Sequence, residues 1–266
     1  MSATVALPRP AAAVPAQPTE AREIPQLSRR QIAKVWAAAA LPMGTLAWVV
    51  APQVADSIDG PGAMARALIG MMLIGLVWQF VLVMILVRRE QGTLRPSVVR
   101  EALWLRKPTS PKTGRRGGRV WLVIPVFLFV VAFQELIPSL PIPDEYNAVK
   151  FFESDEAKDL LAGNWVWLAI ITAQALFNPV FGEELLFRGY LLPRMEGAFG
   201  RKDWLVNGII FGAYHLHRPW VIPFGVFDAL AYAYPAKRYR SALLGMAVHS
   251  FQSLLIIGLT VSLVVS

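Results

Sequence analysis

Cysteine is absent from this chain of 266 residues, which excludes disulfide bonds, thiolate nucleophiles and zinc sites built on cysteine. Histidine occurs only three times, and no His-Glu-x-x-His sequence is present, which excludes a metal site of the zincin type. A Gly-x-Ser-x-Gly nucleophile elbow is also missing. The Gly-x-Gly-Asp context of an aspartate pair is missing too, with Gly-Val-Phe-Asp at 225–228 as its nearest approach. Carboxylates and imidazoles are the groups left to carry chemistry.

Charged residues are scarce as well, at 17% of the chain, whereas 55% of the residues are apolar. The apolar residues are gathered into blocks, which indicates an integral membrane protein. We therefore expect an all-α fold, a polytopic transmembrane helix bundle of about seven spans, within a range of about six to eight. The expected spans cover residues 35–51, 67–87, 120–140, 165–187 and 242–265, with two shorter apolar pieces at 204–216 and 220–234 that stop at Pro219 and Pro235.

The net charge of +8 comes from one region between apolar blocks, residues 88–119, where basic residues far outnumber acidic ones. A basic loop between two spans is typical of the cytoplasmic side of a membrane protein. The loop therefore predicts that these basic residues face the lipid bilayer and do not bind nucleic acid. We expect the plasma membrane of a prokaryote, with the N-terminus in the cytoplasm.

The chain divides into three predicted regions. Residues 1–28 are rich in Ala and Pro without apolar periodicity, and we predict a disordered cytoplasmic tail. Residues 29–159 would form the N-terminal spans with the basic loop 88–119. Residues 160–266 would form a second membrane domain, and this domain holds the polar residues described next.

Two adjacent carboxylates, Glu183 and Glu184, lie near the end of an apolar block, in the sequence FNPVFGEELLFRGYLLPR. Charges at membrane depth are expensive and mark functional sites. Glu184 comes four residues before Arg188, the favourable order for a helical ion pair, so we predict a structural pair. Neighbouring helical residues point about 100° apart, so Glu183 cannot share this partner in the same way. Glu183 is therefore a candidate general base or acid, the alternative being that both carboxylates are interfacial.

The three histidines all follow in apolar context. His215 ends the run NGIIFGAYH, and His249 lies about two turns into the last span. A neutral imidazole is suited to binding a metal or to hydrogen-bonding an oxyanion. The alternative is a core histidine with satisfied hydrogen bonds. His217 we expect at the membrane interface.

Other polar residues accompany these histidines. Ser253 lies four residues after His249, on the same helical face, where it could donate to a shared cavity or bond a backbone carbonyl. Asp228 is a further acid in apolar context, either paired elsewhere in the bundle or functional. Gly208 and Gly212 form a small-residue face that predicts close contact with another helix.

The depth of these residues predicts that they meet. Glu183 and His249 both lie toward the cytoplasmic ends of their spans, and His215 falls within reach of them. We therefore predict one site in the cytoplasmic half of the membrane, open to water from that side.

These motifs resemble those of the CAAX-protease and bacteriocin-processing family (CPBP, or Abi) of intramembrane endopeptidases. The family has Glu-Glu-x-x-x-Arg, Phe-x-x-x-His and His-x-x-x-Asn on successive membrane helices. Glu183, Glu184 and Arg188 match the first motif, Phe211 and His215 the second, and His249 the histidine of the third. The last position is Ser253 instead of Asn. The resemblance covers about residues 160–262.

The resemblance implies an intramembrane metalloendopeptidase, a hydrolase of the CAAX-processing type, with residues 160–266 as its catalytic membrane domain. Glu183 would activate a water that attacks a peptide carbonyl, and His215 would position or polarise that water. His249 and Ser253 would stabilise the oxyanion, while Glu184 and Arg188 form the structural pair. A divalent metal such as zinc, if one is used, would be held by Glu183, His215 and His249. The partner would be a membrane-associated peptide or protein.

Two other functions remain open. A non-catalytic membrane protein of this family, with an immunity or maturation-assisting role, is the alternative that the departure at Ser253 suggests. A proton-coupled transporter could use Glu183, Asp228 and histidine as a relay, although no internal repeat relates the two halves of the chain.

Overall fold

The computed structural model of the chain describes residues 23–133 and 140–266. Over these residues the regular secondary structure is helical, and the β-bridge between Thr109 and Arg116 is isolated. The prediction of an all-α fold is therefore confirmed for the described part of the chain. Most of the predicted tail, 1–28, and the end of the predicted span 120–140 lie outside the described residues.

Four helices in the described chain are long and apolar enough to cross a membrane, which makes this an integral membrane protein. The first joins α1 (Arg29–Thr45) to α2 (Ala51–Ala55) through a π-helical turn, and the second and fourth are α3 (Ala63–Gln91) and α13 (Ala242–Val265). The third runs from Trp165 to Arg194 and begins as α8 (Trp165–Leu176). The expected number of about seven is thus met only in part.

The other predicted spans are shorter helices. Residues Gly118–Ala132 form an apolar helix of intermediate length, which ends in α5 (Ile124–Ala132). The predicted piece 204–216 is α10 (Asp203–Tyr214). The short helices that connect these elements are α4 (Pro96–Ala102), α6 (Ala148–Glu153), α7 (Asp155–Leu161) and α9 (Glu196–Phe199).

The predicted stop at Pro235 is wrong. After a 3-10 turn, α11 (Gly225–Asp228) passes through a π-helical turn into α12 (Tyr234–Tyr239). Pro235 is the second residue of α12, directly after the π-helical turn, and the helix continues past it although proline has no N–H to donate. The chain therefore stays helical until Arg240, which adopts the left-handed conformation and ends it.

The close contact expected at Gly208 and Gly212 is confirmed. A Cβ atom on Gly208 would lie 2.2 Å from the Cα of Ala229, and one on Gly212 would lie 2.7 Å from the Cα of Gly225. Because no side chain fits there, α10 packs with its backbone directly against α11 and the turn that follows. This contact fixes the end of α10, where His215 begins the next loop.

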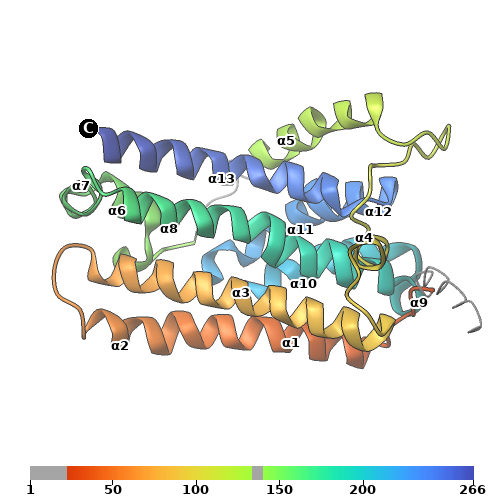
Figure 1. The fold of residues 1–266 in the computed structure, drawn as a ribbon, viewed down its shortest axis with the longest axis horizontal. Helices are drawn as coiled ribbons and strands as arrows, with labels where there is room; N and C mark the ends of the chain where they lie inside the picture. The colour runs from red at the N-terminus through yellow and green to blue at the C-terminus, as the bar shows by residue number, and fades with distance from the viewer. Residues whose placement is uncertain (1–22, 134–139) are drawn as a thin grey trace, which may run out of the picture.

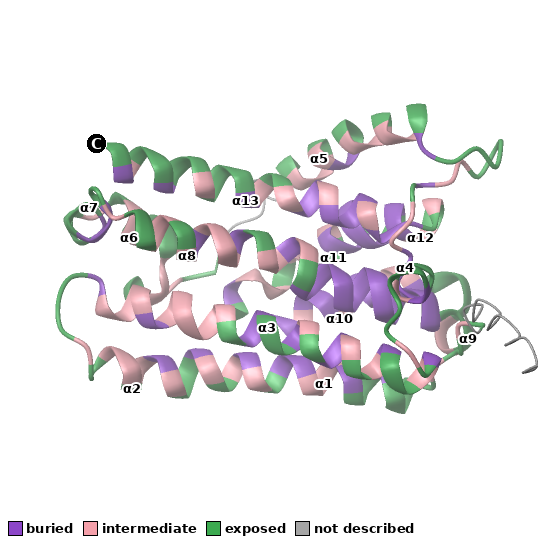
Figure 2. Cartoon of the chain, viewed as in Figure 1, coloured by how far each residue is buried: buried purple, intermediate pink, exposed green. Residues whose placement is uncertain are grey.

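The long helices lie side by side, with α10, α11 and α12 packed among them (Figure 1). Buried residues concentrate on α10, α11 and the neighbouring part of the bundle, whereas α3 and α13 carry mainly intermediate and exposed residues (Figure 2). The exposed residues on these two helices include large apolar side chains, such as Ile74, Val77, Val81, Leu254 and Leu255. Exposed apolar stripes of this kind suit contact with lipid.

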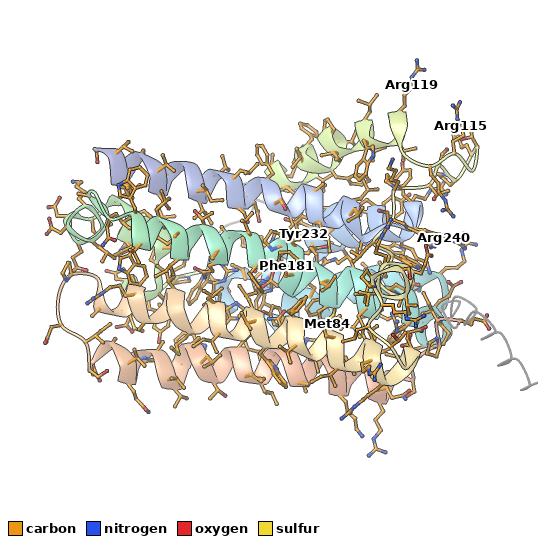
Figure 3. All side chains as sticks on the ribbon, in the orientation of Figure 1. Met84, Arg115, Arg119, Phe181, Tyr232 and Arg240 are labelled. Carbon is orange, nitrogen blue, oxygen red and sulfur yellow. The ribbon has the colours of Figure 1, made fainter. Side chains whose placement is uncertain are left out.

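The two ends of the bundle differ in charge. Arg115, Arg119 and Arg240 lie at one end (Figure 3), the end that also holds α4 and α9. The described end of the predicted tail docks there, because the Leu27 N–H donates to the Arg194 carbonyl oxygen over 2.9 Å. At the opposite end lie α6 and α7. They belong to the connector, residues 141–164, which joins the third and fourth predicted spans and is rich in acidic residues.

Candidate active site

Glu183 follows a π-helical turn, Phe177–Gly182, which changes the register of the helix. The Glu183 N–H donates to the carbonyl of Asn178, five residues earlier. This spacing stacks the two side chains on one face. With its amide nitrogen turned toward the carboxylate, Asn178 donates to both oxygens of Glu183, over 3.1 and 3.2 Å. The sequence did not predict this partner, because ordinary helical spacing would point Asn178 away from Glu183.

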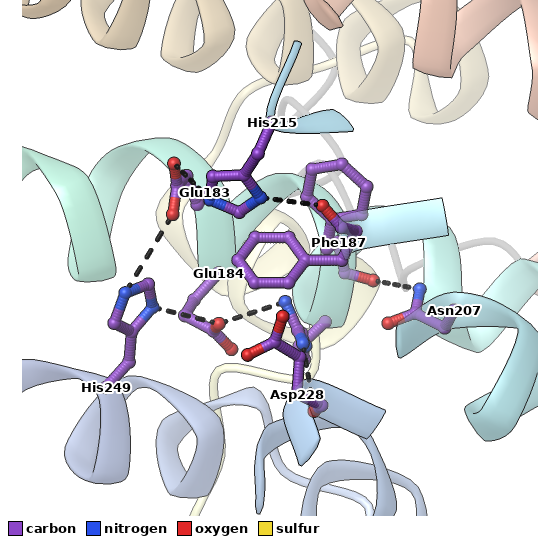
Figure 4. Close-up of polar contacts among 9 residues, drawn as sticks. Glu183, Glu184, Phe187, Asn207, His215, Asp228 and His249 are labelled. Carbon is purple, nitrogen blue, oxygen red and sulfur yellow. Dashed lines mark hydrogen bonds and ion pairs between the residues drawn. The ribbon is translucent and has the colours of Figure 1, made fainter. Parts of the chain in front are cut away.

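Glu183 meets imidazoles from two other elements (Figure 4). Its Oε1 lies 3.9 Å from Nε2 of His215, and its Oε2 lies 3.9 Å from Nε2 of His249. All three side chains are buried, and that of Glu183 is 2% exposed. Both distances are too long for a direct hydrogen bond. The structure therefore brings the three residues together and leaves a space between the carboxylate and each ring.

His215 lies just past the last residue of α10, and its ring orientation is fixed by the helix it follows. Its Nδ1 lies 2.9 Å from the carbonyl oxygen of Phe211, an acceptor, so Nδ1 carries the proton and donates. In the neutral ring Nε2 is then an acceptor, and it faces Glu183. The ring edge also packs against Phe211, with centroids 4.9 Å apart.

His249 is held differently, from α13. Its Nδ1 lies 3.2 Å from Oε1 of Glu184, and its ring stacks on Tyr232 with centroids 5.0 Å apart. A carboxylate paired with a cation is ionised and only accepts, so His249 Nδ1 donates to Glu184. The ring therefore bridges the two adjacent carboxylates, with Nδ1 on Glu184 and Nε2 toward Glu183.

Glu184 and Arg188 form a fully buried ion pair, with Nη1 of Arg188 3.0 Å from Oε1 of Glu184. The guanidinium also donates to the Asp228 carbonyl over 3.3 Å and lies over the Phe211 ring at 4.1 Å. A Cβ atom on Gly245 of α13 would lie 2.3 Å from Oε2 of Glu184, so only glycine fits beside the pair. This tight packing is what a structural role requires.

The remaining predicted residues lie around this centre. Ser253 is buried one turn after His249 on α13. The side chain of Asp228 is buried near Arg188 and Glu184, which accounts for an acid at this depth (Figure 4).

Tyr214 was not singled out from the sequence, although it lies inside the site. Its hydroxyl accepts from Nε2 of Gln79, on α3, over 2.6 Å, and both residues are fully buried. The hydroxyl keeps its own proton to donate, and the Glu183 carboxylate and the Arg218 guanidinium are charged groups that it interacts with. Gln79 and Tyr214 are 135 positions apart, so spacing along the chain offers no signal for this contact.

A cavity of about 230 Å³ reaches Glu183. Glu183, Asn178, His217 and Ser253 are among the polar residues that line it, and most of its other walls are apolar. The cavity extends away from the basic end, toward the connector, whose Tyr146 packs on Trp48 with centroids 4.4 Å apart. The expectation of a site open toward the basic end is therefore not supported by the cavity.

His217 is buried within the protein, at 4% exposure, and its expected place at the membrane interface stays a prediction. Its ring stacks on that of His215, with centroids 5.3 Å apart. Within the described chain, Glu183, His215 and His217 are the group whose possible metal-ligating atoms all lie within 4.8 Å of one another. His249, the ligand implied by the family resemblance, is outside this group. A carboxylate and two imidazoles are a donor set that fits zinc and similar ions.

Comparison with known families gives a match to the part of the chain that contains these residues. Residues 164–255 match the model of the family described as type II CAAX prenyl endopeptidase, Rce1-like. The match runs from the start of α8 to α13 and so includes both carboxylates and all three histidines. No curated protein and no solved structure matched the chain. Residues 164–255 are thus a domain of the Rce1-like CAAX protease (CPBP, or Abi) family.

Proposed function

We propose that the chain is an intramembrane endopeptidase that hydrolyses peptide bonds of membrane-associated substrates, with residues 160–266 as its catalytic membrane domain. The observation that carries the proposal is the space between Glu183 and its imidazoles, two contacts of 3.9 Å at the end of a cavity. A water that bonds two such atoms over about 2.8 Å each would subtend about 90° between them, a geometry that water adopts readily. The family match supports the same activity.

In this proposal Glu183 and His215 hold the attacking water. Nε2 of His215 is an acceptor because Nδ1 donates to Phe211, so the ring and the carboxylate each accept one proton of the water. Glu183 takes a proton as the water oxygen bonds to the peptide carbonyl carbon. The carbon–nitrogen bond then breaks, and the proton held by Glu183 passes to the leaving amine. Water and peptide thus give one carboxylic acid and one amine.

His249 and Ser253 would stabilise the oxyanion of the tetrahedral intermediate. Nδ1 of His249 donates to Glu184, so a second proton on Nε2 makes the ring an imidazolium. The charges of Glu183 and Glu184 balance that of the ring. Ser253 lines the cavity one turn along α13 and adds a hydroxyl donor on the same face.

A divalent metal fits the donor set on the Glu183 side of the site. Glu183 and two imidazoles would hold it, and when bound it would supply Lewis-acid polarisation of water or carbonyl. Asn178 and Tyr214 would orient Glu183 in either case. Glu184 and Arg188 would keep their structural role.

We place the N-terminus and the basic end of the bundle in the cytoplasm, in the plasma membrane of a prokaryote. Glu183 is 11 positions from Arg194 and 18 from Trp165 in its helix, so it lies in the half nearer the basic end. The shorter helices, with α10 and α11–α12, would complete a bundle of about seven membrane segments. A peptide would reach Glu183 through the cavity under the connector.

The test is cleavage of a membrane-anchored reporter peptide by the purified chain in lipid vesicles. Glu183→Gln keeps the size of the side chain and its contact with Asn178 but removes the base. We expect cleavage by the parent and none by this variant, with both inserted in the vesicles to the same extent. Retained cleavage by Glu183→Gln would refute the proposal.

One observation favours a second function, a non-catalytic member with an immunity or maturation-assisting role. Ser253 occupies the position of the family's asparagine, and losing an oxyanion donor can cost about 10²–10³ in rate. If the parent does not cleave and Ser253→Asn does, this second function is the better description. Robust cleavage by the parent excludes it.

A further inference from the structure

We infer that Glu183, His215 and His217 form the binding site for one divalent transition-metal ion of the zinc class, and that His249 is not a ligand. The inference names the cofactor site of the proposed endopeptidase, and it rests on that function only for the use of the ion in hydrolysis. Binding itself is a property of these three side chains.

The three ligand atoms are close to the spacing that a metal requires. All lie within 4.8 Å of one another, and the Glu183–His215 pair is 3.9 Å apart. Ligands at about 2.0–2.1 Å in a tetrahedral zinc site are about 3.4 Å apart. Side-chain rotations that bring the ligand atoms about 0.5–1.5 Å closer together therefore close the site, with no change in the helices that carry it.

His215 is already prepared as a ligand. Its Nδ1 donates to the Phe211 carbonyl, which leaves Nε2 unprotonated and directed at Glu183. Metal-bound histidines characteristically donate their second nitrogen to a carbonyl or carboxylate in this way. The Glu183 carboxylate in turn accepts hydrogen bonds from the Asn178 amide, which holds it in position as well.

His217 has a buried nitrogen that the described chain leaves unsatisfied. Nδ1 of this ring is buried and has no hydrogen-bond partner among the described residues. An unsatisfied buried polar group costs about 1–3 kcal/mol. The ring is held in place by stacking on His215 and by the edge of Tyr214, with centroids 5.4 Å apart. Coordination of the ion by this nitrogen would satisfy it and offset the cost.

The cavity supplies an open coordination position. Glu183 and His217 both line it, so a water or a substrate oxygen can approach the ion from that side. Arg218 lines the same cavity and opposes a cation, but it is exposed, where water and salt screen its charge.

His249 lacks these features. Its Nδ1 is engaged by Glu184, a carboxylate that also bonds Arg188, and its ring is stacked on Tyr232. Only Nε2 approaches Glu183, and it faces Oε2, whereas Nε2 of His215 faces Oε1 (Figure 4). The two candidate ligand sets therefore differ by one residue, and two matched substitutions separate them.

The experiment compares His217→Phe with His249→Phe in the full chain, purified in detergent, stripped with a chelator and titrated with cobalt(II) chloride. Phenylalanine keeps the ring packing at both positions and removes the ligand. Bound cobalt is followed by its visible absorption, and bound zinc is counted by mass spectrometry. We expect one ion per chain in the parent and in His249→Phe, and at least a 100-fold loss of affinity in His217→Phe. His217→Asn provides the same test if His217→Phe does not yield folded protein.

Loss of the ion in His249→Phe with retention in His217→Phe would overturn the inference, as would a parent that binds no ion. Cleavage activity is read separately. A stripped parent that still cleaves in a Glu183-dependent manner would rule out a role of the ion in hydrolysis and leave the proposed endopeptidase intact. A parent that binds one ion through His217 but never cleaves would support the metal site and count against the proposed function.

Discussion

One side of the site is closed, and the other is open. Glu184 lies against Arg188 and His249, at contacts of 3.0 and 3.2 Å, with no room for even a methyl group at Gly245. Glu183, the preceding residue, has its carboxylate oxygens 3.9 Å from Nε2 of His215 and Nε2 of His249, and a cavity lies beside it. Two neighbouring carboxylates of the same chemistry thus have opposite surroundings. The difference teaches that Glu184 is enclosed by its partners whereas Glu183 borders open space, and on this ground we propose Glu184 for the fold and Glu183 for the chemistry.

Substitution of Glu183 is expected to have the largest effect on cleavage. Glu183→Gln removes a general base, worth about 10²–10⁴-fold in rate, and we expect kcat to fall by at least that amount. Folding should be nearly unchanged, because the amide keeps the packing of the carboxylate. Reporter cleavage and thermal unfolding measured on the same preparation check both halves. Unfolding of the variant under conditions where the parent is stable would show that Glu183, like Glu184, is needed for the fold.

Substitution of Glu184 should act mainly on stability. Glu184→Gln leaves the Arg188 guanidinium buried without its counter-charge, which costs about 3–5 kcal/mol. We expect a lower unfolding temperature in detergent and little folded protein. The double variant Glu184→Gln/Arg188→Met removes both charges and should lose less than Glu184→Gln alone. A double variant that is less stable than the single one would contradict a structural pair.

Ser253 should affect rate more than substrate affinity. Ser253→Ala removes a hydroxyl on the oxyanion side, and we expect kcat to fall by about 10²-fold with little change in KM. Ser253→Thr, which retains a hydroxyl, is the matched control. Equal rates for the parent and Ser253→Ala would remove Ser253 from the oxyanion site.

Asn178 should have a smaller effect. Asn178→Ala deletes hydrogen bonds to a charged group, worth about 1.5–3 kcal/mol, which corresponds to about 10–100-fold in kcat if the carboxylate loses its position. Asn178→Asp tests the direction of the bond, because a second carboxylate repels the first. If Asn178→Asp were as active as the parent, the orientation assigned to this amide would be wrong.

The smallest effect is expected far from the site, at the basic end. Lys237 donates to Glu196 over 2.7 Å, and this bond, with the charge of Lys237, lowers the pKa of Glu196. A lowered folded-state pKa gives stability that is present above the unfolded pKa, about 4.3, and is lost as the pH falls through the folded value. Because Glu196 is exposed, Glu196→Gln should cost less than about 1 kcal/mol. Equal loss at pH 7 and at pH 3 would contradict this origin.

The sequence predicted those parts of the site that depend on ordinary helical spacing. Glu184 and Arg188 are four residues apart on one helix, and Gly208 and Gly212 mark a contact face, so both contacts follow from the 3.6-residue repeat. The partner of Glu183 could not be predicted in this way. A π-helical turn shifts the register by one residue and places Asn178 beneath the carboxylate.

Contacts between distant segments were also beyond the sequence. His217 follows the end of α10, and the turn that stacks it on His215 depends on how α10 packs against α11. Its neighbours Arg218 and Pro219 indicate an interface, which is why we expected it there. The cavity joins α3, α13 and the connector, and its direction follows from their packing and not from charge.

The most direct test of the account is to make the same change, Glu to Gln, at 183 and at 184, and to measure cleavage and thermal unfolding for both. The account predicts opposite profiles, with Glu183→Gln folded like the parent but inactive, and Glu184→Gln destabilised but with residual activity in its folded fraction. Identical profiles for the two variants, or activity retained without Glu183, would contradict the claim that this carboxylate performs the chemistry.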